Sequence, residues 1–480
     1  MTKEGEYLDP KDWQEFGKQM HDLLDKCLAR MQDARELPWI PKPADLSERL
    51  SLKARTEGLG AAQTFSQLSE NVMPYATGNT HPQFFGWVHG AGLPISVGAE
   101  IVAATMNSNC GGRDHGAIEV ERATLDWLLD LSGMPDTASA ILTTGTSQAT
   151  ILALSAARNR LFGHEVRTTG IGALPDIAVY VRKGTHSCIA KALEVMGHGK
   201  DALHMVETNA DMQMDMASLR AAIVADRAAG RVPMAIVGTA GSVNTGSFDN
   251  FDDLADLCLE ENIWLHVDGA FGFWAVLADD PWRNLVTGMN RANSIACDFH
   301  KWMSVPYDCG ACMIYDRDLH FGTFSSRPNY LEQQESGLGR GDLWFCDFGL
   351  ELSRGFRALK IWTAVQSIGT KAFSASITDN CKQAQLMEKL VIDSDLLELS
   401  FPVVSNVCCF FVEAGDVRDI SAKLQLNGDA VFSTTVIGGR SCLRAALVNH
   451  RTTSDDICCA ISAVEKAVEA SLESTVADDQ

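Results

Sequence analysis

The central part of the chain alternates short apolar runs with stretches of helical periodicity. The runs are apolar at their centres, as in "DIAVYVR", "MAIVGTA", "IWLHVDGAF", "SIACDFH" and "GACMIYD", which is typical of strands buried on both faces. Between them, "TSQATILALSAARNRLF", "THSCIAKALEVMG" and "FDDLADLCLEEN" carry apolar residues at helical spacing. This alternation predicts an α/β domain with a mostly parallel sheet.

The two ends of the chain show other patterns. Near the start, Asp9 is the expected N-cap and Pro10 the first residue of a helix whose apolar residues recur from Trp13 to Met31. We expect that apolar face to dock on a later domain or on another subunit. Towards the other end, "VVSNVCCFFVE", "AVFSTTVI" and "SCLRAALV" predict strands, followed by a helix that is capped near Thr453.

A chain of 480 residues is long enough for more than one core. The patterns predict an N-terminal helical segment over residues 1–74, a large α/β domain over 75–370 and a small α+β domain over 371–480. "LPWIPKPADL" predicts an extended connector after the first helix.

Charge and targeting signals narrow the possible partners. The chain has 40 Lys and Arg residues against 62 Asp and Glu residues, a net charge of −22. Such a surface repels nucleic acid and anionic membranes, so we expect neither as a partner. The start "MTKEGEYLDPKDW" lacks the pattern of a secretory signal. We therefore expect a cytoplasmic protein whose 14 cysteines are reduced thiols, without a metal site.

One candidate for ligand binding is the stretch "LTTGTSQATILALSAARNR", where a strand passes through Gly145, Thr146 and Ser147 into a helix. Backbone N–H groups at a helix start, with two hydroxyls beside a glycine, suit a phosphate group. An ordinary Ser/Thr N-cap explains the same residues. The stretch is not a Walker loop, because no Gly-Lys-Ser/Thr follows.

Three further residues are candidates for chemistry. Asp268 ends an apolar strand, where α/β sheets bind ligands, and its carboxylate needs a cation or a strong donor. Lys301 follows the next strand, and His186 stands at a strand-to-helix junction. Each alone has a structural explanation, as a hydrogen-bonding, surface or packing residue. Together with the phosphate loop they fit pyridoxal phosphate, which needs an amine, an acid for its ring nitrogen and a flat group over its ring.

Five motifs also carry a family resemblance. "DFHKWMSVPYDCG", "HVDGAFG", "THSCIAKA", "GSVNTGSFD" and "HPQFFGW" together resemble the group II pyridoxal-phosphate-dependent amino-acid decarboxylases, which include aromatic-L-amino-acid, glutamate and cysteine-sulfinate decarboxylases. The likeness spans roughly residues 75 to 450. It implies the aspartate-aminotransferase fold, fold type I of the pyridoxal phosphate enzymes, and a homodimer in which the N-terminal segment is swapped between subunits.

The resemblance also implies a role for each candidate residue. Lys301 would bind the cofactor's aldehyde covalently, Asp268 would pair with the ring nitrogen, and His186 would stack on the ring. The residues that would complete the cofactor site are Gly145, Thr146, Ser147, Asn244, Ala270, His300 and Arg354. Asn244 stands where some animal members have a threonine, and Asp298 where several members have asparagine. The implied reaction is decarboxylation of an L-amino acid to an amine and carbon dioxide.

The loop "SSRPNYLEQQESGLGRGD" has the polar, glycine-containing composition of a mobile lid. Tyr330 in this loop matches the family's proton donor, although a tyrosine in a loop is in general more often a packing anchor. Relatives that produce aldehydes typically have phenylalanine at this position, so the tyrosine favours simple decarboxylation. An aldehyde synthase, an aminotransferase and a catalytically silent regulatory homologue remain alternatives.

Substrate choice is expected to rest on "HPQFFGWVHG" and "MNSNCGGRDHGAIEVE". Phe85, Trp87 and His89 in the first stretch suit an aromatic side chain, and the phenylalanines are equally plausible as core. Arg113 in the second stretch would instead suit an acidic substrate, unless it pairs locally at the surface. The sequence favours an aromatic substrate and leaves an acidic one open.

Overall fold

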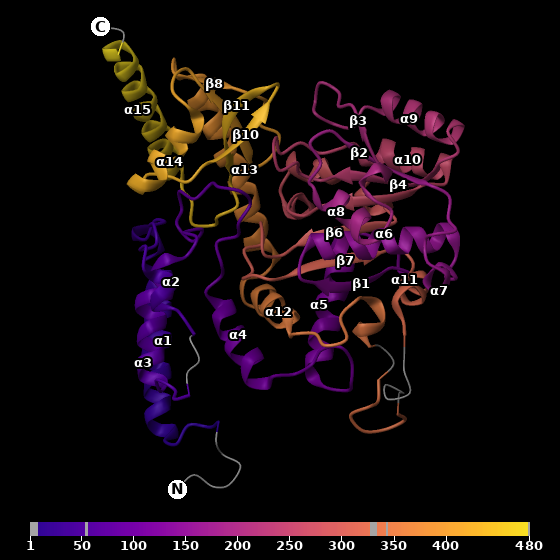
Figure 1. Cartoon of the computed structure of the whole chain (residues 1–480), viewed down its shortest axis with the longest axis horizontal. Helices are drawn as coiled ribbons and strands as arrows, with labels where there is room; N and C mark the ends of the chain where they lie inside the picture. Colours follow the sequence, from indigo (N-terminus) through magenta and orange to yellow (C-terminus); the bar gives the residue numbers. More distant parts are fainter. Residues whose placement is uncertain (1–7, 53–55, 327–333, 342–343, 479–480) are drawn as a thin grey trace.

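The structure, a computed structural model, describes residues 8–52, 56–326, 334–341 and 344–478, with side chains up to residue 473. Its described part contains a seven-stranded sheet, a four-stranded sheet and a group of helices from the first part of the chain (Figure 1). None of the helices in these ranges combines the length and the apolarity that a membrane crossing requires.

The seven-stranded sheet has the order β1-β7-β6-β5-β4-β2-β3. Neighbouring strands run parallel from β6 to β3, whereas β7 runs antiparallel to both β6 and β1. The prediction of an α/β fold with a mostly parallel sheet is confirmed. The strands are β1 (Ser139–Thr143), β2 (Ile177–Arg182), β3 (Leu203–Val206), β4 (Val232–Thr239), β5 (Trp264–Asp268), β6 (Ser294–Asp298) and β7 (Gly310–Ile314).

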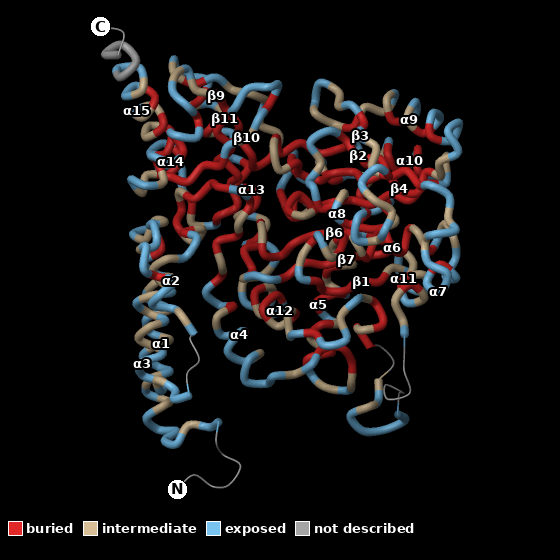
Figure 2. Tube along the Cα trace, in the orientation of Figure 1, coloured by how far each residue is buried: buried red, intermediate tan, exposed pale blue. Residues whose placement is uncertain are grey.

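Helices cover both faces of this sheet, because alternate side chains of each strand point to opposite faces. On β6, for example, Ile295 and Cys297 join one apolar cluster and Ala296 joins the other. One cluster contains side chains of α6 (Thr146–Phe162), α8 (Cys188–Val195) and α11 (Arg317–Phe324). The other contains side chains of α5 (Gly116–Ser132), α9 (Met216–Ala228), α10 (Phe251–Glu261) and α12 (Arg357–Ile368). Figure 2 shows the strands buried and the outer helices exposed.

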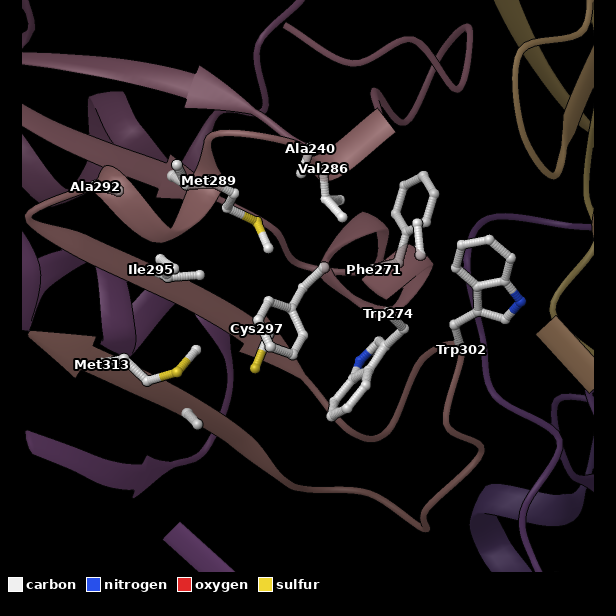
Figure 3. Close-up of a cluster of buried hydrophobic side chains, with 14 of the residues drawn as sticks. Ala240, Phe271, Trp274, Val286, Met289, Ala292, Ile295, Cys297, Trp302 and Met313 are labelled. Carbon is white, nitrogen blue, oxygen red and sulfur yellow. The ribbon is translucent and has the colours of Figure 1, made fainter. Parts of the chain in front are cut away.

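Behind the carboxyl end of β6 lies a cluster of buried aromatic side chains, including Trp274 and Trp302 (Figure 3). The Trp274 ring lies 4.8 Å from that of Phe299, and its Nε1 donates to the carbonyl oxygen of Asp298 at 2.9 Å. Trp302 Nε1 donates to Asn380 Oδ1 at 3.0 Å. This packing fixes the backbone on both sides of Lys301.

The four-stranded sheet is antiparallel, in the order β10-β11-β9-β8. Phe85 belongs to its core, with its ring 5.3 Å from Phe432, so a segment early in the chain packs on this late sheet. Thr453 and Asp456 cap the last helix reciprocally, which confirms the predicted capped helix. The elements here are β8 (Leu397–Leu399), β9 (Val407–Val412), β10 (Ser433–Ile437), β11 (Arg440–Ala446), α13 (Thr370–Ile392), α14 (Val417–Asn427) and α15 (Ser454–Asp478).

The first helix begins later than the sequence predicts. Asp12, not Asp9, is its N-cap: the Asp12 carboxylate accepts hydrogen bonds from the N–H groups of Gln14 and Glu15. Both aspartates can cap, and the one whose carboxylate reaches the free N–H groups of the first turn is Asp12. The helices here are α1 (Trp13–Gln32), α2 (Leu46–Arg49), α3 (Ala61–Gln67) and α4 (Ile95–Met106), and a short α7 (Val166–Thr169) follows α6.

Helix α1 carries an uncovered apolar face. It lies alongside α3 at one side of the molecule (Figure 1), and none of its residues is buried. Trp13, Met20 and Leu28 are 66%, 38% and 44% exposed. On α4, Val102 and Met106 are also exposed. The apolar periodicity of α1 is therefore not explained by contacts within the described chain.

Candidate active site

A cavity lies at the carboxyl ends of β4, β5 and β6, beside the start of α6, with Arg444 of β11 contributing from the second sheet. Carboxyl ends of parallel strands are where α/β sheets bind ligands. The predicted site residues that line this cavity are Trp87, His89, Gly145, Thr146, Ser147, His186, Asp268, Ala270, His300 and Lys301. Segments that are far apart in the sequence are thus brought to one place.

Lys301 follows β6 directly and its side chain is 25% exposed towards the cavity. Its Nζ lies 2.9 Å from Asp298 Oδ2. Because Trp274 is bonded to the backbone at Asp298, before the lysine, and Trp302, directly after it, is bonded to Asn380, the lysine extends from a rigid turn. A half-buried amine on a rigid support is suited to covalent chemistry with an aldehyde.

Asp268 ends β5 and is 5% exposed. Burial raises the pKa of its carboxyl above the ordinary value, and the charge of Lys301 is the main influence in the opposite direction. Its Oδ1 accepts from the Ala270 N–H at 3.2 Å. A buried carboxylate is stabilised by a cationic partner, so a protonated ring nitrogen held beside Asp268 would complement it.

The start of α6 has the properties of a phosphate cradle. Gly145 is the N-cap and has no side chain to cap the helix, and the Thr146 N–H of the first turn donates to Asp298 Oδ1 at 2.7 Å. Thr146 is 5% exposed, and its buried Oγ1 has no hydrogen-bond partner. A hydroxyl left unpaired in this way needs an acceptor. A phosphate at the N-terminus of α6 would supply that acceptor and would interact favourably with the helix dipole.

Two histidines present ring N–H groups to the cavity. His300 Nδ1 accepts from the Cys309 N–H at 3.0 Å, and His186 Nδ1 accepts from the Cys188 N–H at 3.2 Å. Since Nδ1 is the acceptor in each neutral ring, the proton is on Nε2. Burial lowers the pKa of His300, so its ring is held neutral with Nε2 as a donor. These residues fit a phosphate-bearing cofactor with a cationic ring.

Other predicted residues lie outside the cavity lining. Phe85 is in the core of the second sheet. Arg113 lies over the Trp344 ring, 4.3 Å from its centroid. Val243, the neighbour of Asn244, lines the cavity instead, while Asn244 Oδ1 accepts from Thr435 Oγ1 at 2.9 Å. Tyr330 lies outside the described residues.

Arg354 is also absent from the lining, because its guanidinium is fully buried and engaged elsewhere. It pairs with Glu121 at 2.6 Å and donates to the carbonyl oxygens of Cys110 and Leu142, both at 2.9 Å. Arg354 therefore lies away from the cavity lining, and its guanidinium ties α5 to β1.

The cavity also contains residues that sequence reasoning missed. Arg444 is 5% exposed, donates to the Val243 carbonyl oxygen at 2.9 Å, and has a buried Nε without a partner. The Tyr307 ring lies 4.4 Å from that of His300, and burial raises its pKa to about 12. Asp298 contributes a second carboxylate. An arginine inside the apolar run "SCLRAALV" was the available signal for Arg444.

The aromatic side of the cavity is formed by Trp87 and His89. Their rings stack at 5.6 Å with 23° between planes, and His89 meets Tyr307 edge to face at 6.0 Å. Elsewhere, Cys309 and Cys312 have the spacing of a metal motif, but both are buried at β7. The described residues contain no group of three or more His, Cys, Asp or Glu side chains that could hold a metal ion.

Comparison with known proteins adds independent information. The family model of the pyridoxal-dependent decarboxylase conserved domain matches residues 43–413. An aromatic-L-amino-acid decarboxylase of Bacillus atrophaeus is 28% identical over 465 residues, covering 94% of each chain. Tryptophan decarboxylase 1 of Oryza sativa subsp. japonica is 28% identical, covering 92% of each chain.

Solved structures agree in fold. The crystal structure of Oryza sativa TDC with PLP and tryptamine has a TM-score of 0.87 at 25% identity, covering 96% of this chain and 99% of that one. Mouse CSAD has a TM-score of 0.86 at 21% identity, covering the same shares. The likeness in fold thus extends over nearly the whole chain.

Proposed function

We propose, on the premise that this chain belongs to the pyridoxal-dependent decarboxylase family, that it converts an aromatic L-amino acid into the corresponding amine and carbon dioxide. Family membership makes the chain a carboxy-lyase that uses pyridoxal 5'-phosphate. The observation that carries the proposal is the convergence of Lys301, Asp268 and His186 in one cavity beside the stacked Trp87 and His89.

The residues of the cavity would divide the work of holding the cofactor. Lys301 would bind its aldehyde, and Asp268 would keep its ring nitrogen protonated. Thr146, Ser147 and the Nε2–H of His300 would hold its phosphate. The cofactor, when bound, supplies an electron sink for the bond that loses carbon dioxide. His186 and Ala270, which line the same cavity, would contact the cofactor's ring.

The substrate would be held by the residues around the cofactor. The guanidinium of Arg444, with its unpaired Nε, would receive a carboxylate, because charge-assisted hydrogen bonds are the strongest available to a buried arginine. Trp87, His89 and the neutral phenol of Tyr307 would contact a flat side chain. Similarity to aromatic-L-amino-acid and tryptophan decarboxylases supports the same substrate class. Tyr330 remains our candidate for the proton donor.

An acidic substrate is the second candidate, because Arg444 is a cation in the cavity. Arg113, the cation first considered for this role, lies over Trp344 and outside the lining. The aromatic proposal therefore has the stronger support. Simple decarboxylation, not aldehyde formation, is favoured by the identity of Tyr330.

We further propose that the chain forms a homodimer through the exposed apolar faces of α1 and α4, where Trp13, Leu28 and Met106 lack cover. The proposed division of the chain remains 1–74, 75–370 and 371–480. A cytoplasmic location also remains a proposal.

The test is an assay of the purified, cofactor-loaded protein against a panel of aromatic, acidic and sulfur amino acids, with amine, aldehyde and carbon dioxide measured separately. We expect amine and carbon dioxide in equal amounts from tryptophan, tyrosine or phenylalanine. Lys301→Ala should give neither, and borohydride should no longer attach the cofactor to that peptide. Turnover restricted to glutamate, aspartate or cysteine sulfinate would refute the aromatic assignment, and aldehyde without amine would refute simple decarboxylation.

A further inference from the structure

The second carboxylate of the cavity, Asp298, has contacts on two sides. It ends β6, is 2% exposed and lines the cavity. Its Oδ1 accepts from the Thr146 N–H at 2.7 Å, and its Oδ2 lies 2.9 Å from Lys301 Nζ and 3.7 Å from His300 Nε2. One carboxylate therefore joins the first turn of α6 to the lysine.

These two contacts place different demands on the side chain. The hydrogen bond from Thr146 requires an oxygen, which the amide of asparagine would supply with the same shape. The contact with Lys301 Nζ at 2.9 Å is strengthened by a negative charge, which an amide would not supply. A buried carboxylate without a cation is costly, and a carboxylate beside a phosphate cradle is unfavourable unless a cation offsets it. The negative charge of Asp298 is thus explained by its contact with Lys301, and not by the hydrogen bond from Thr146.

We propose that Asp298 is the counter-ion that holds Lys301 as an ammonium beside the cofactor site whenever the lysine is not bound to the cofactor. The inference rests on the proposed role of Lys301. Asp298 acts through that lysine and is a positioning residue. When Lys301 is free of the cofactor, its Nζ would take up the proton that an incoming substrate ammonium gives up, and Asp298 would pair with the resulting cation. The lysine would have to give up that proton again before it could bind the cofactor.

Other charged or titratable groups face Lys301 from every neighbouring element. Asp268 on β5 is the other carboxylate, and burial raises its pKa while the charge of Lys301 acts in the opposite direction. Burial lowers the pKa of His89, and the charge of Lys301 adds to that effect. The remaining members of the cavity are His186, Cys188, His300, Tyr307 and Arg444. A variant in which only Asp298 is changed retains all of these groups. A difference in the reactivity of Lys301 between the wild type and that variant therefore reports on Asp298.

The test uses Asp298→Asn, which keeps an oxygen for the Thr146 N–H and removes the charge. The cofactor-free full chain is treated with formaldehyde and cyanoborohydride, and methylation of Lys301 is followed by mass spectrometry of its peptide. Only the free amine attacks formaldehyde; water leaves, and cyanoborohydride reduces the product. At pH 7 we expect methylation about tenfold faster in the variant, the effect of losing one charge partner at this distance. The difference should narrow as the pH is raised.

Two controls separate electrostatics from structure. Lys191 on α8 is exposed and should react equally in both proteins. Asp298→Glu retains the charge and should restore slow methylation. Equal rates for Lys301 in the wild type and Asp298→Asn, with equal melting temperatures, would overturn the proposal. If borohydride instead attaches the cofactor to another lysine, the proposed role of Lys301 fails, whatever the effect of Asp298→Asn.

Discussion

Replacing Arg354 with methionine should destabilise the fold without removing a cofactor contact. The variant leaves Glu121, which is fully buried, without the cation 2.6 Å away. Burial raises the pKa of Glu121, and Arg354 is the largest influence that lowers it. Deleting one partner of a buried ion pair costs about 3–5 kcal/mol.

The magnitude can be worked out from the carboxyl group. Without Arg354, the cheapest response is to protonate Glu121, which at pH 7 costs roughly 3.7 kcal/mol for a group with an ordinary pKa of about 4.3. The folded variant then binds one proton more than the unfolded chain, so its stability rises as the pH falls. At pH 5 the cost should have dropped to roughly 1 kcal/mol.

The assay is urea unfolding of the full chain at pH 7 and pH 5, together with cofactor absorbance per folded molecule. The matched control is Arg357→Met, because Arg357 pairs with Glu351 and Asp308 in a more exposed setting and should cost about 1 kcal/mol or less. Arg354→Met combined with Glu121→Leu should recover most of the loss. A single variant that keeps its stability and loses the cofactor would refute this reasoning.

Two further outcomes follow from the structure. Burial lowers the pKa of His266 to about 4. Below pH 6.5 the unfolded chain therefore takes up a proton at this residue that the folded chain excludes. The free energy of unfolding should fall by roughly 3 kcal/mol between pH 6.5 and pH 4. His266→Asn should reduce the pH dependence of the unfolding free energy, measured by urea titration, by about one proton. An unchanged pH dependence would contradict this prediction. If the proposed dimer forms through α1, Trp13→Ser with Leu28→Ser should shift it to monomer in light scattering, whereas serine at exposed Val224 and Leu259 should not.

Much of the candidate site was predictable because it follows from sheet topology. Asp268 ends β5 and Lys301 follows β6, which are parallel neighbours, and the start of α6 lies at the same edge. A sequence that predicts parallel strands therefore also predicts that residues after their carboxyl ends converge. The motif around Lys301 added the chemistry, which periodicity alone does not give.

The residues that were missed depend on contacts that no local pattern encodes. Arg444 reaches the cavity because β11 of the second sheet lies against Val243, and strand periodicity does not say how two sheets dock. Arg354 was assigned to the cofactor site by family resemblance, and no local pattern indicated its ion pair because Glu121 is distant in the sequence. Phe85 was predicted either for the substrate pocket or for the core. It lies in the core, because its ring packs against Phe432 of the second sheet, which is distant in the sequence.

The balance of charge in the cavity argues for the aromatic substrate. Among the described residues of the lining, Asp268 and Asp298 face the cations Lys301 and Arg444. A bound cofactor adds a phosphate dianion and one ring cation, so the site is then already negative overall. An aromatic amino acid brings one ammonium and one carboxylate, so the net charge of the site does not change. An acidic side chain adds a further negative charge that no group in the lining compensates. At about 5 Å and an effective dielectric constant of about 20, that charge costs roughly 3 kcal/mol, so kcat/KM for aromatic substrates should exceed that for acidic ones by about 100-fold.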